Sequence, residues 1–386
     1  MTPPAPSRAS SFSENALEEA VVEGNTAFAL KLYQELGTSA GNLFFSPYSI
    51  STALGMAYGG AREKTAREMR EALHFPLEQA LLHPAFGHIS RDLAAAAHGD
   101  GQQLAIANGL CLTGGEVQDS FKSLLKDNYD AEIFRGTVDE INAWVKRKTE
   151  GKISEILTSL DANSVCVLLN AIYFKGVWES RFKKEQTHDA PFKVSAQKLV
   201  TVAFMHQNSD FKILEKPDFQ AVLIPYKGIA MSMIILLPQQ VDGLAALERQ
   251  VTAENLNQWL TELYGQVARQ TELSMPKYKL ESGYDLVAPC KKLGMKDAFD
   301  PAGAADFSGM GWPKGKLWIS QIKHKAFVEV NEEGTEAAAA TIVGMRTMSA
   351  GRSPVFCADH PFLFLIRHNR TGSILFMGRI SDPKGA

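Results

Sequence analysis

The stretch from Glu332 to Pro354 constrains the fold of this chain more than any other, because it interrupts the succession of helices and strands and has no obvious place among them. It reads EEGTEAAAATIVGMRTMSAGRSP, and five of its residues are alanine. Apolar runs of strand length follow it at Phe362–Ile366 and Ile374–Met377. Long loops inside compact domains are uncommon and usually functional. The segment therefore predicts a functional loop on the surface of a folded domain.

The rest of the chain has the composition of a soluble globular protein. It has 386 residues, of which 45% are hydrophobic and 22% are charged. We find no internal repeat and no long linker rich in proline, glycine or serine, so one large domain is a simpler interpretation than two or three. We expect residues 1–18 to form a mobile tail and residues 19–386 to form the domain.

Charge and hydropathy argue against several classes of partner. The formal net charge is −3 with no basic stripe, which argues against a nucleic-acid binder. The most apolar stretches, Val165–Phe174 and Met231–Leu237, are too short to span a bilayer. Residues 1–13 lack the apolar run of a signal peptide, which favours the cytoplasm or release without a signal peptide. We expect buried free thiols and neither a metal site nor a cofactor, because the four cysteines are far apart: Cys111, Cys166, Cys290 and Cys357.

Helix signals come first along the chain and strand signals follow, which favours the α+β class. Ser46 is a suitable N-cap for a helix that begins at Pro47. Pro276 weakens the strand signal of Leu273–Leu280, and Thr371-Gly372 is placed as in a hairpin. The other expected helices are Gly24–Leu36 and Val138–Glu150, and the other expected strands are Val165–Phe174, Ala221–Ile224, Met231–Leu237 and Phe362–Ile366.

Two enzyme motifs occur in contexts that do not suit catalysis. Ser39 is the serine of a GxSxG pattern, but a helix precedes it where a nucleophile elbow needs a strand. Ser123 begins an SxxK pattern without the companion elements of that enzyme class. His206 and His360 have no evident carboxylate or cysteine partners, so we expect structural roles for them. A hydrolase that uses Ser39 is kept as a remote alternative.

The loop could form a strand with two different faces, because side chains alternate along a strand. One face is uncharged and the other carries both charges, so the first could enter a sheet and be buried. An alanine run is also a helix signal, and the segment could be a simple linker. The first face consists of Thr335, Ala337, Ala339, Thr341, Val343 and Met345, and the second of Glu336, Ala338, Ala340, Ile342, Gly344 and Arg346.

Several motifs, in the same order along the chain, resemble those of the serpin family, from about Asn25 to Pro383. Each is moderately specific, and together they are hard to obtain by chance. They are the hinge-like Asn331–Thr341, the helix start Asn42–Ile50, the strand-like Leu169–Trp178, His324–Ala326 before the hinge, and Ala358–Phe364 after the loop.

The resemblance implies an α+β domain with about three β-sheets, about nine helices and an exposed reactive loop near residues 332–354. It implies a protease inhibitor rather than an enzyme. The family spacing places the scissile bond at Met348–Ser349, and a slip of two residues would place it at Arg346–Thr347. Met345, Arg346 and Thr347 would then tune specificity. The implied hinge comprises Glu332, Glu333, Gly334, Thr335, Glu336, Ala337, Ala338, Ala339, Ala340 and Thr341.

The resemblance also implies a site where the main sheet opens to admit the hinge. The residues implied there are Ser46, Ser49, Asn170 and His324, with Trp178 near the point of first insertion. The implied partner is a serine protease of the chymotrypsin, elastase or subtilisin kind, held as a covalent acyl complex. We expect a native monomer with a hazard of polymerisation by loop insertion. No heparin site is expected, since residues 83–99 are poor in lysine and arginine. A non-inhibitory carrier or chaperone of this family is the alternative.

Overall fold

The structure is a computed structural model that describes residues 13–97, 101–160, 165–335 and 354–385. Within these residues it contains nine α-helices, in agreement with the number of about nine that the family resemblance implied. They are α1 (Glu14–Leu36), α2 (Pro47–Gly60), α3 (Glu63–Ala72), α4 (Gln79–Ala97), α5 (Asp119–Tyr129), α6 (Val138–Lys148), α7 (Leu244–Gln250), α8 (Ala253–Gly265) and α9 (Val287–Lys292). A short 3₁₀ helix, η1, spans Lys184–Gln186.

Fifteen strands lie in the same described residues. They are β1 (Leu43–Phe45), β2 (Gln103–Leu112), β3 (Glu132–Phe134), β4 (Cys166–Val177), β5 (His188–Ser195), β6 (Lys198–Glu215), β7 (Phe219–Pro225), β8 (Met231–Pro238), β9 (Arg269–Pro276), β10 (Tyr278–Asp285), β11 (Ile319–Val330), β12 (Gly334–Thr335), β13 (Val355–Cys357), β14 (Phe362–His368) and β15 (Ile374–Ile380). The predicted α+β class is thus confirmed.

The strands form two hydrogen-bonded networks. Six strands make one of them in the order β10-β11-β4-β2-β3, with β12 paired to β4. Nine make the other in the order β1-β15-β14-β8-β7-β6-β9-β13, with β5 paired to β6. The long strand β6 joins two parts of this second network, because its residues 204–211 pair with β9 and its residues 212–215 pair with β7. Dividing the network at β6 gives the three sheets that were expected.

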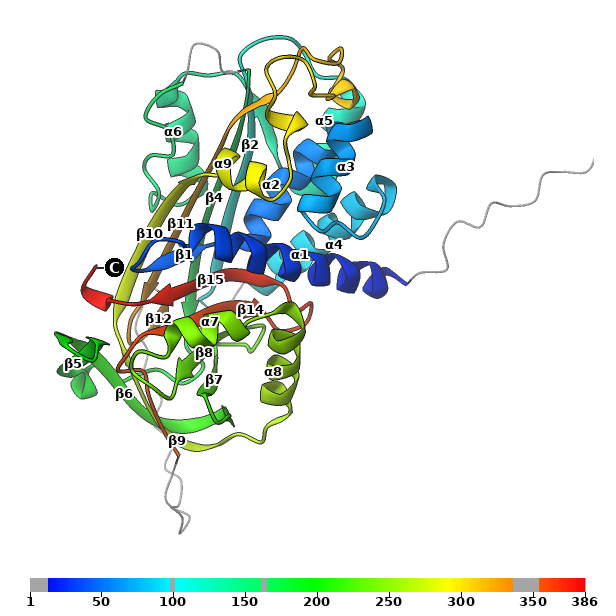
Figure 1. Cartoon of the computed structure of the whole chain (residues 1–386). Coiled ribbons are helices and arrows are strands. Elements are labelled where there is room, and N and C mark those ends of the chain that lie inside the picture. The colour runs from blue at the N-terminus through cyan, green and yellow to red at the C-terminus, as the bar shows by residue number, and fades with distance from the viewer. Residues whose placement is uncertain (1–12, 98–100, 161–164, 336–353, 386) are drawn as a thin grey trace, which may run out of the picture.

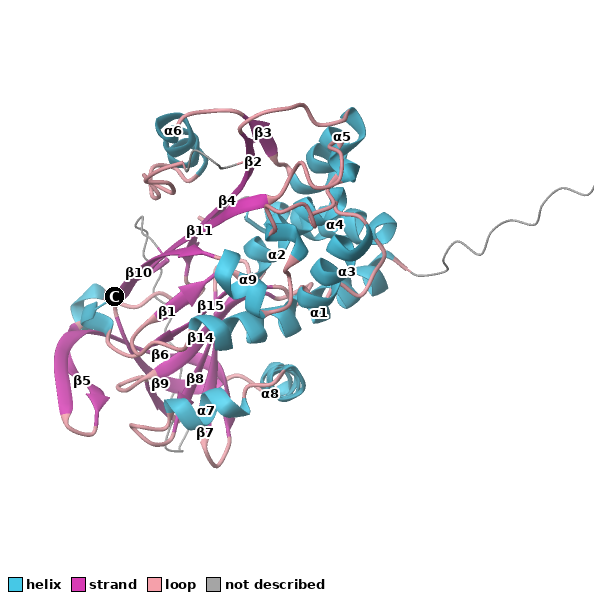
Figure 2. Cartoon of the chain, turned by 45° about the horizontal axis from the view of Figure 1, so that its top comes forward, coloured by secondary structure: helices cyan, strands magenta, loops and turns pink. Residues whose placement is uncertain are grey.

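Helices cover the two networks on different sides (Figure 1). Helices α2 to α5 gather beside the sheet of β4 and β11, whereas α7 and α8 lie at the other end of the molecule beside β7 and β8. Figure 2 shows the same separation after a turn of the molecule. In the part of the chain that the structure describes, no helix combines the length and apolar character that crossing a membrane requires.

The first helices show how local sequence sets the ends of these elements. Helix α1 begins at Glu14, because the Ser13 side chain caps it by accepting from the Ala16 N–H (3.3 Å). The expected start at Gly24 was therefore ten residues late, and residues 14–18 belong to the helix rather than to a tail. The capping of α2 is as predicted: the Ser46 side chain accepts from the Ser49 N–H, and Pro47 opens the helix.

Other sequence predictions need small corrections. The run Leu273–Leu280 is not one strand, because β9 ends at Pro276 and β10 begins at Tyr278 in the other network. The Thr371-Gly372 hairpin between β14 and β15 is confirmed. Three of the four cysteines are buried free thiols, but Cys357 is only half-buried.

Strand β4 separates two hydrophobic clusters. Its even-numbered residues from Cys166 to Phe174, with Asn170 as the polar exception, pack into the main core of the molecule. Its odd-numbered residues from Val167 to Tyr173 pack into a smaller cluster with Trp144 of α6. Both faces of this strand are therefore covered over most of its length, as a central strand requires.

Candidate functional site

A tight turn carries the chain from β11 back onto the end of β4. The Asn331 N–H donates to the Gly334 carbonyl (2.8 Å), and the Gly334 N–H donates to the Asn331 carbonyl (3.2 Å). Strand β12 then runs antiparallel to β4, with Gly334 opposite Val177 and Thr335 opposite Gly176. Gly334 has φ of 140°, and a Cβ there would overlap the Gly176 carbonyl oxygen. The turn therefore requires glycine at this position.

Trp178 lies at this turn and contacts it through both its ring and its backbone. Its ring N–H donates to the Asn331 carbonyl (2.9 Å), and its backbone N–H donates to the Glu333 carbonyl (2.9 Å). The ring is 1% exposed and stacks on Tyr226, with 4.6 Å between ring centroids. A buried indole with its N–H satisfied fixes the turn against β4.

Two buried glutamates hold the turn through ion pairs. The Glu332 carboxylate contacts Lys277 (2.9 Å) and accepts from the Thr187 hydroxyl (2.9 Å), and Glu333 pairs with Lys184 (2.8 Å). Burial opposes ionisation of Glu332, but the hydrogen bonds from Lys277 and Thr187 outweigh it and hold the pKa of this carboxyl below its usual value. The hinge is thus tied to the segment 184–187 by its charged side chains.

A buried polar network joins β4, β11 and α2. Asn170 and His324 occupy paired positions on the parallel strands β4 and β11. The Ser46 N–H donates to His324 Nε2 (3.2 Å), so the ring proton belongs on Nδ1, which donates to Asn170 Oδ1 (2.6 Å). The Asn170 amide donates to the Ser49 hydroxyl (2.6 Å) and to Asn108 Oδ1 (2.8 Å). The network therefore contains all four residues predicted from the family resemblance, together with Asn108.

Every polar group of Asn170 is satisfied in this network, and the two strands cannot part without breaking it. All the side chains involved are at most 5% exposed. A buried donor or acceptor that loses its partner costs about 1–3 kcal/mol. The network thus stabilises the closed arrangement of β4 and β11. The two strands can still separate if the polar groups of the network form hydrogen bonds with new partners.

Burial lowers the pKa of His324 to about 3, so the imidazole is neutral in the native protein. The unfolded chain binds a proton to this residue at a higher pH, near 6.5, and so carries more protons than the native state between these values. His324 alone should therefore lower native stability by about 1.4 kcal/mol for each pH unit as the pH drops through this window.

Urea unfolding at pH 7, 6, 5 and 4 measures this loss. His324→Gln removes the titrating group, so the stability of this variant should fall less steeply as the pH drops, although the variant should be less stable than the parent at pH 7. Equal slopes in the two proteins would contradict the assignment of a neutral, buried His324.

The remaining predicted site residues lie outside the residues that the structure describes. These are Glu336 to Thr341 of the hinge, Met345 to Thr347, and the bond Met348–Ser349. Sequence reasoning missed Lys184, Thr187 and Lys277, which hold the hinge, and Asn108 in the buried network. Asn108 could have been suspected, since it is a polar residue within the apolar strand β2. The three hinge contacts have no such signal, because they are ordinary surface residues in the sequence.

The rejected enzyme motifs have structural explanations. Ser39 lies in the turn after α1, where the Arg379 guanidinium donates to the carbonyls of Gly37, Ser39 and Gly41. Ser123 is on the exposed side of α5. The GxSxG pattern is therefore an arginine-bound turn.

His360 differs from the sequence prediction, because it does have a carboxylate partner. Its Nδ1 lies 2.7 Å from Asp359 Oδ1, and its Nε2 lies 2.7 Å from the Pro238 carbonyl. A buried histidine with both nitrogens engaged ties the segment after β13 to β8. The role is structural, as was expected.

Comparison with known proteins agrees with this geometry. Residues 23–383 match the serpin (serine protease inhibitor) family. Serpin B6 of Pongo abelii is 40% identical over 383 residues, covering 95% of this chain and 100% of the relative. The leukocyte elastase inhibitor of Sus scrofa is 40% identical over 388 residues, with the same coverage.

Solved structures show the same fold. Serpin48 of Tenebrio molitor superposes with a TM-score of 0.83 at 30% identity, covering 94% of this chain and 98% of its own. Human thyroxine-binding globulin in complex with its hormone superposes with a TM-score of 0.85 at 28% identity, covering 96% of this chain and 100% of its own. The chain thus belongs to the serpin family and is a protease inhibitor, not an enzyme.

Proposed function

We propose that this serpin is a suicide substrate of chymotrypsin-like, elastase-like or subtilisin-like serine proteases, cleaved between Met348 and Ser349. The protease serine attacks the Met348 carbonyl, the bond to Ser349 breaks, and the Ser349 amine leaves with the C-terminal part of the chain. The freed hinge then enters the sheet between β4 and β11 before water can release the acyl-enzyme. Strand addition within one chain supplies the driving force.

The observation that carries this proposal is the register of β12 on β4. Gly334 opposite Val177 and Thr335 opposite Gly176 form the first step of an antiparallel strand beside β4. The pairing of β11 with β4 ends at Phe327 opposite Tyr173. A strand that continued from Thr335 would therefore meet the first β4–β11 pair after only two more residues, and would have to separate these strands to advance.

Continuing the same register assigns the two faces of the loop. Residues directly opposite in an antiparallel pair share a face of the sheet. Thr335, Ala337, Ala339, Thr341, Val343 and Met345 would lie opposite the even-numbered residues of β4 from Gly176 to Cys166. Four of those residues, Cys166, Leu168, Ile172 and Phe174, pack into the main core. The uncharged face would therefore be the buried one, in accord with the small size of its first members.

The same register would bring the loop to the buried network and would place one charged residue of the loop opposite a lysine. Thr341 would lie opposite Asn170, so the strand would pass between Asn170 and His324 and replace their hydrogen bond. Glu336 would lie opposite Lys175, which is half-buried at the edge of the sheet. The second face of the loop would not be wet throughout, because the odd-numbered residues of β4 below Lys175 pack against α6.

Distortion of the attached protease would complete the inhibition. Catalytic groups displaced by about 1 Å can lose about a hundredfold in rate. The acyl bond to Met348 then outlives the active site that should hydrolyse it. We expect the native inhibitor to be a monomer, with polymerisation by loop insertion between molecules as its failure mode.

The proposed function is tested by incubating the protein with chymotrypsin, pancreatic elastase and trypsin, followed by denaturing gels and mass spectrometry. We expect a denaturant-stable complex with chymotrypsin or elastase and a released peptide that begins at Ser349. Cleavage of the loop without such a complex would replace the proposal with a non-inhibitory substrate or carrier.

Oxidation of Met348 should weaken inhibition. The sulfoxide brings a polar group into an apolar primary pocket, so the association rate with chymotrypsin should fall roughly tenfold or more. Association rates before and after mild peroxide treatment measure this, with the variant Met348→Leu as a control that cannot be oxidised at this position. An unchanged rate for the oxidised parent would argue against Met348 as the residue that enters the pocket.

A further inference from the structure

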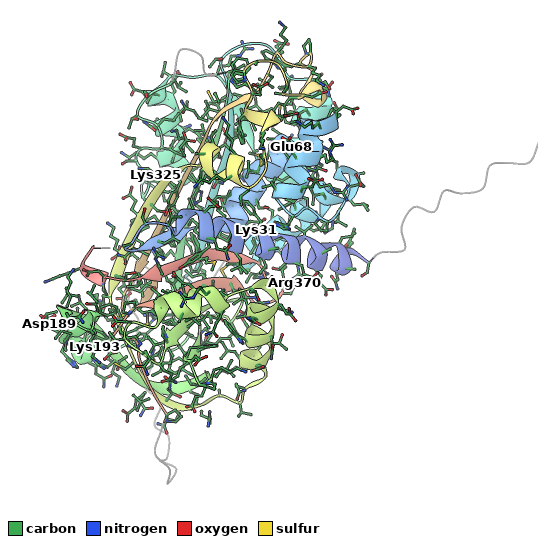
Figure 3. All side chains as sticks on the ribbon, in the orientation of Figure 1. Lys31, Glu68, Asp189, Lys193, Lys325 and Arg370 are labelled. Carbon is green, nitrogen blue, oxygen red and sulfur yellow. The ribbon has the colours of Figure 1, made fainter. Side chains whose placement is uncertain are left out.

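Two histidines on neighbouring strands stack face to face beside the hinge. His188 is the first residue of β5 and His206 lies on β6, with 4.3 Å between the ring centroids and 3° between the ring planes. Strand β5 pairs with β6 alone among the described strands. Figure 3 labels Asp189 and Lys193 on β5, at the margin of the molecule. The stack therefore joins the start of an edge strand to the sheet.

The hydrogen bonds of the pair are incomplete. His206 Nδ1 lies 2.7 Å from the Ser274 hydroxyl, while its buried Nε2 has no hydrogen-bond partner within the residues that the structure describes. His188 Nδ1 lies 3.3 Å from the Gln186 carbonyl. Burial and the neighbouring His188 both lower the pKa of His206 below its ordinary value of 6.5.

The residues just before His188 hold both hinge glutamates. Lys184 pairs with Glu333 (2.8 Å), and the Thr187 hydroxyl donates to Glu332 (2.9 Å). The hinge-holding segment (residues 184–188) thus contacts the hinge through Lys184 and Thr187 and joins the histidine stack through His188. Movement of His188 away from His206 would move Thr187, which is its direct neighbour in the chain.

His206 contacts the Ser274 hydroxyl and stacks on His188, while the carboxylates at and near the hinge are engaged elsewhere. The carboxylates of Glu332, Glu333 and Asp359 are each ion-paired with a lysine. The surrounding elements carry many charged and titratable side chains: Lys184 and Glu185 on η1, Asp189 and Lys193 on β5, Lys198, Asp210, Lys212 and Glu215 on β6, Arg269 and Glu272 on β9, Lys277 after it, Glu332 and Glu333 at the hinge, and Cys357, Asp359 and His360 at and after β13.

We propose that the stacked His188 and His206 form a proton-sensitive contact that secures the hinge-holding segment at neutral pH and frees it when both rings become charged. Its consequence for inhibition rests on the proposed function, because a freed hinge would insert sooner. The stack itself does not depend on a protease.

The sign follows from the geometry. Two neutral rings, or one neutral and one charged, can stack, whereas two cations 4.3 Å apart repel each other, although His188 is exposed and only His206 is partly buried. Because the pKa of His206 is lowered in the folded protein, the native arrangement binds fewer protons than the separated rings. The contact is therefore intact above about pH 6.5 and is weakened progressively below it.

Hydrogen exchange of the uncleaved protein at pH 7.5 and pH 5.5 tests this, after correction for the intrinsic pH dependence of exchange. The amides of residues 182–189 and of the turn 331–335 should exchange faster at pH 5.5, by up to roughly tenfold, because this pH lies about one unit below the ordinary pKa of a histidine. His206→Gln and His188→Gln each remove one of the two charges and should abolish this increase. His88→Gln, on α4 and 3.8 Å from Glu14, is the matched control and should leave it unchanged.

An increase that persists in both His206→Gln and His188→Gln would overturn the proposal, and so would the absence of an increase in the parent. The rate at which the protein loses inhibitory activity on storage at the two pH values supplies a second measurement. It should rise at pH 5.5 in the parent and not in His206→Gln, and equal rises would overturn the link to the hinge. Failure to form any protease complex would instead overturn the proposed function and leave the exchange result interpretable.

Discussion

Thr335→Arg is expected to turn this inhibitor into a substrate that the protease cleaves and releases. In the register of β12, residue 335 lies opposite Gly176 and would share the face of β4 that meets the main core. A charge buried there without a partner costs several kcal/mol. Each 1.4 kcal/mol slows insertion about tenfold, while deacylation by water is unaffected. The number of inhibitor molecules consumed per protease should therefore rise at least roughly tenfold.

Titration of a fixed amount of chymotrypsin with parent and variant measures this number, and gels show the covalent complex giving way to cleaved chain. Glu336→Arg is the matched control, because the same arginine one residue later would lie on the opposite face, beside Lys175 at the sheet edge. It should have much the smaller effect. Equal effects would show that the register of β12 does not continue into the loop.

Ala337→Pro tests the same strand through its backbone. Proline has no N–H to donate to the β4 ladder, so it interrupts strand formation at the third residue from Gly334 without adding charge. More molecules of this variant than of the parent should also be consumed for each protease molecule that is trapped. Complex formation at the parent's efficiency would remove residue 337 from the inserting segment.

Local patterns predicted the elements whose ends depend on their own residues. The start of α2 follows from Ser46 and Pro47, whose capping needs only the next few residues. The hairpin at Thr371-Gly372 is likewise local. The buried network was predicted from the family resemblance, since the residues that Asn170 contacts lie 62, 121 and 154 positions away in the sequence. No short-range pattern carries such information.

The contacts that hold the hinge could not be predicted for a related reason. Lys184 and Lys277 look like solvated surface residues until the fold brings them to Glu333 and Glu332. The stack of His188 on His206 depends on the register of β5 against β6. A shift of one residue would send one ring to the other face of the sheet. Register and long-range charge pairing are set by the whole fold, so they became visible only in the structure.

Met348→Arg is expected to redirect the inhibitor from chymotrypsin to trypsin. The residue before the scissile bond fills the primary pocket, and trypsin carries an aspartate there that pairs with arginine, whereas the chymotrypsin pocket is an apolar slot. The association rate with trypsin should rise by roughly a thousandfold, and that with chymotrypsin should fall by a similar factor. The hinge is unchanged, so the trapped fraction per cleavage should stay close to that of the parent.

The same variant also decides which bond is cleaved. Arg346 lies two residues earlier, and a reactive bond at Arg346–Thr347 would make the unmodified chain a trypsin inhibitor that releases a peptide beginning at Thr347. Arg346→Ala would then abolish inhibition of trypsin, whereas Met348→Arg would add little. With the bond at Met348–Ser349, Arg346→Ala leaves the chymotrypsin complex intact and every trapped protease releases a peptide that begins at Ser349. Cleavage at Met348–Ser349 and cleavage at Arg346–Thr347 therefore predict opposite effects of Arg346→Ala and Met348→Arg. Only the residue that enters the primary pocket determines which class of protease is inhibited.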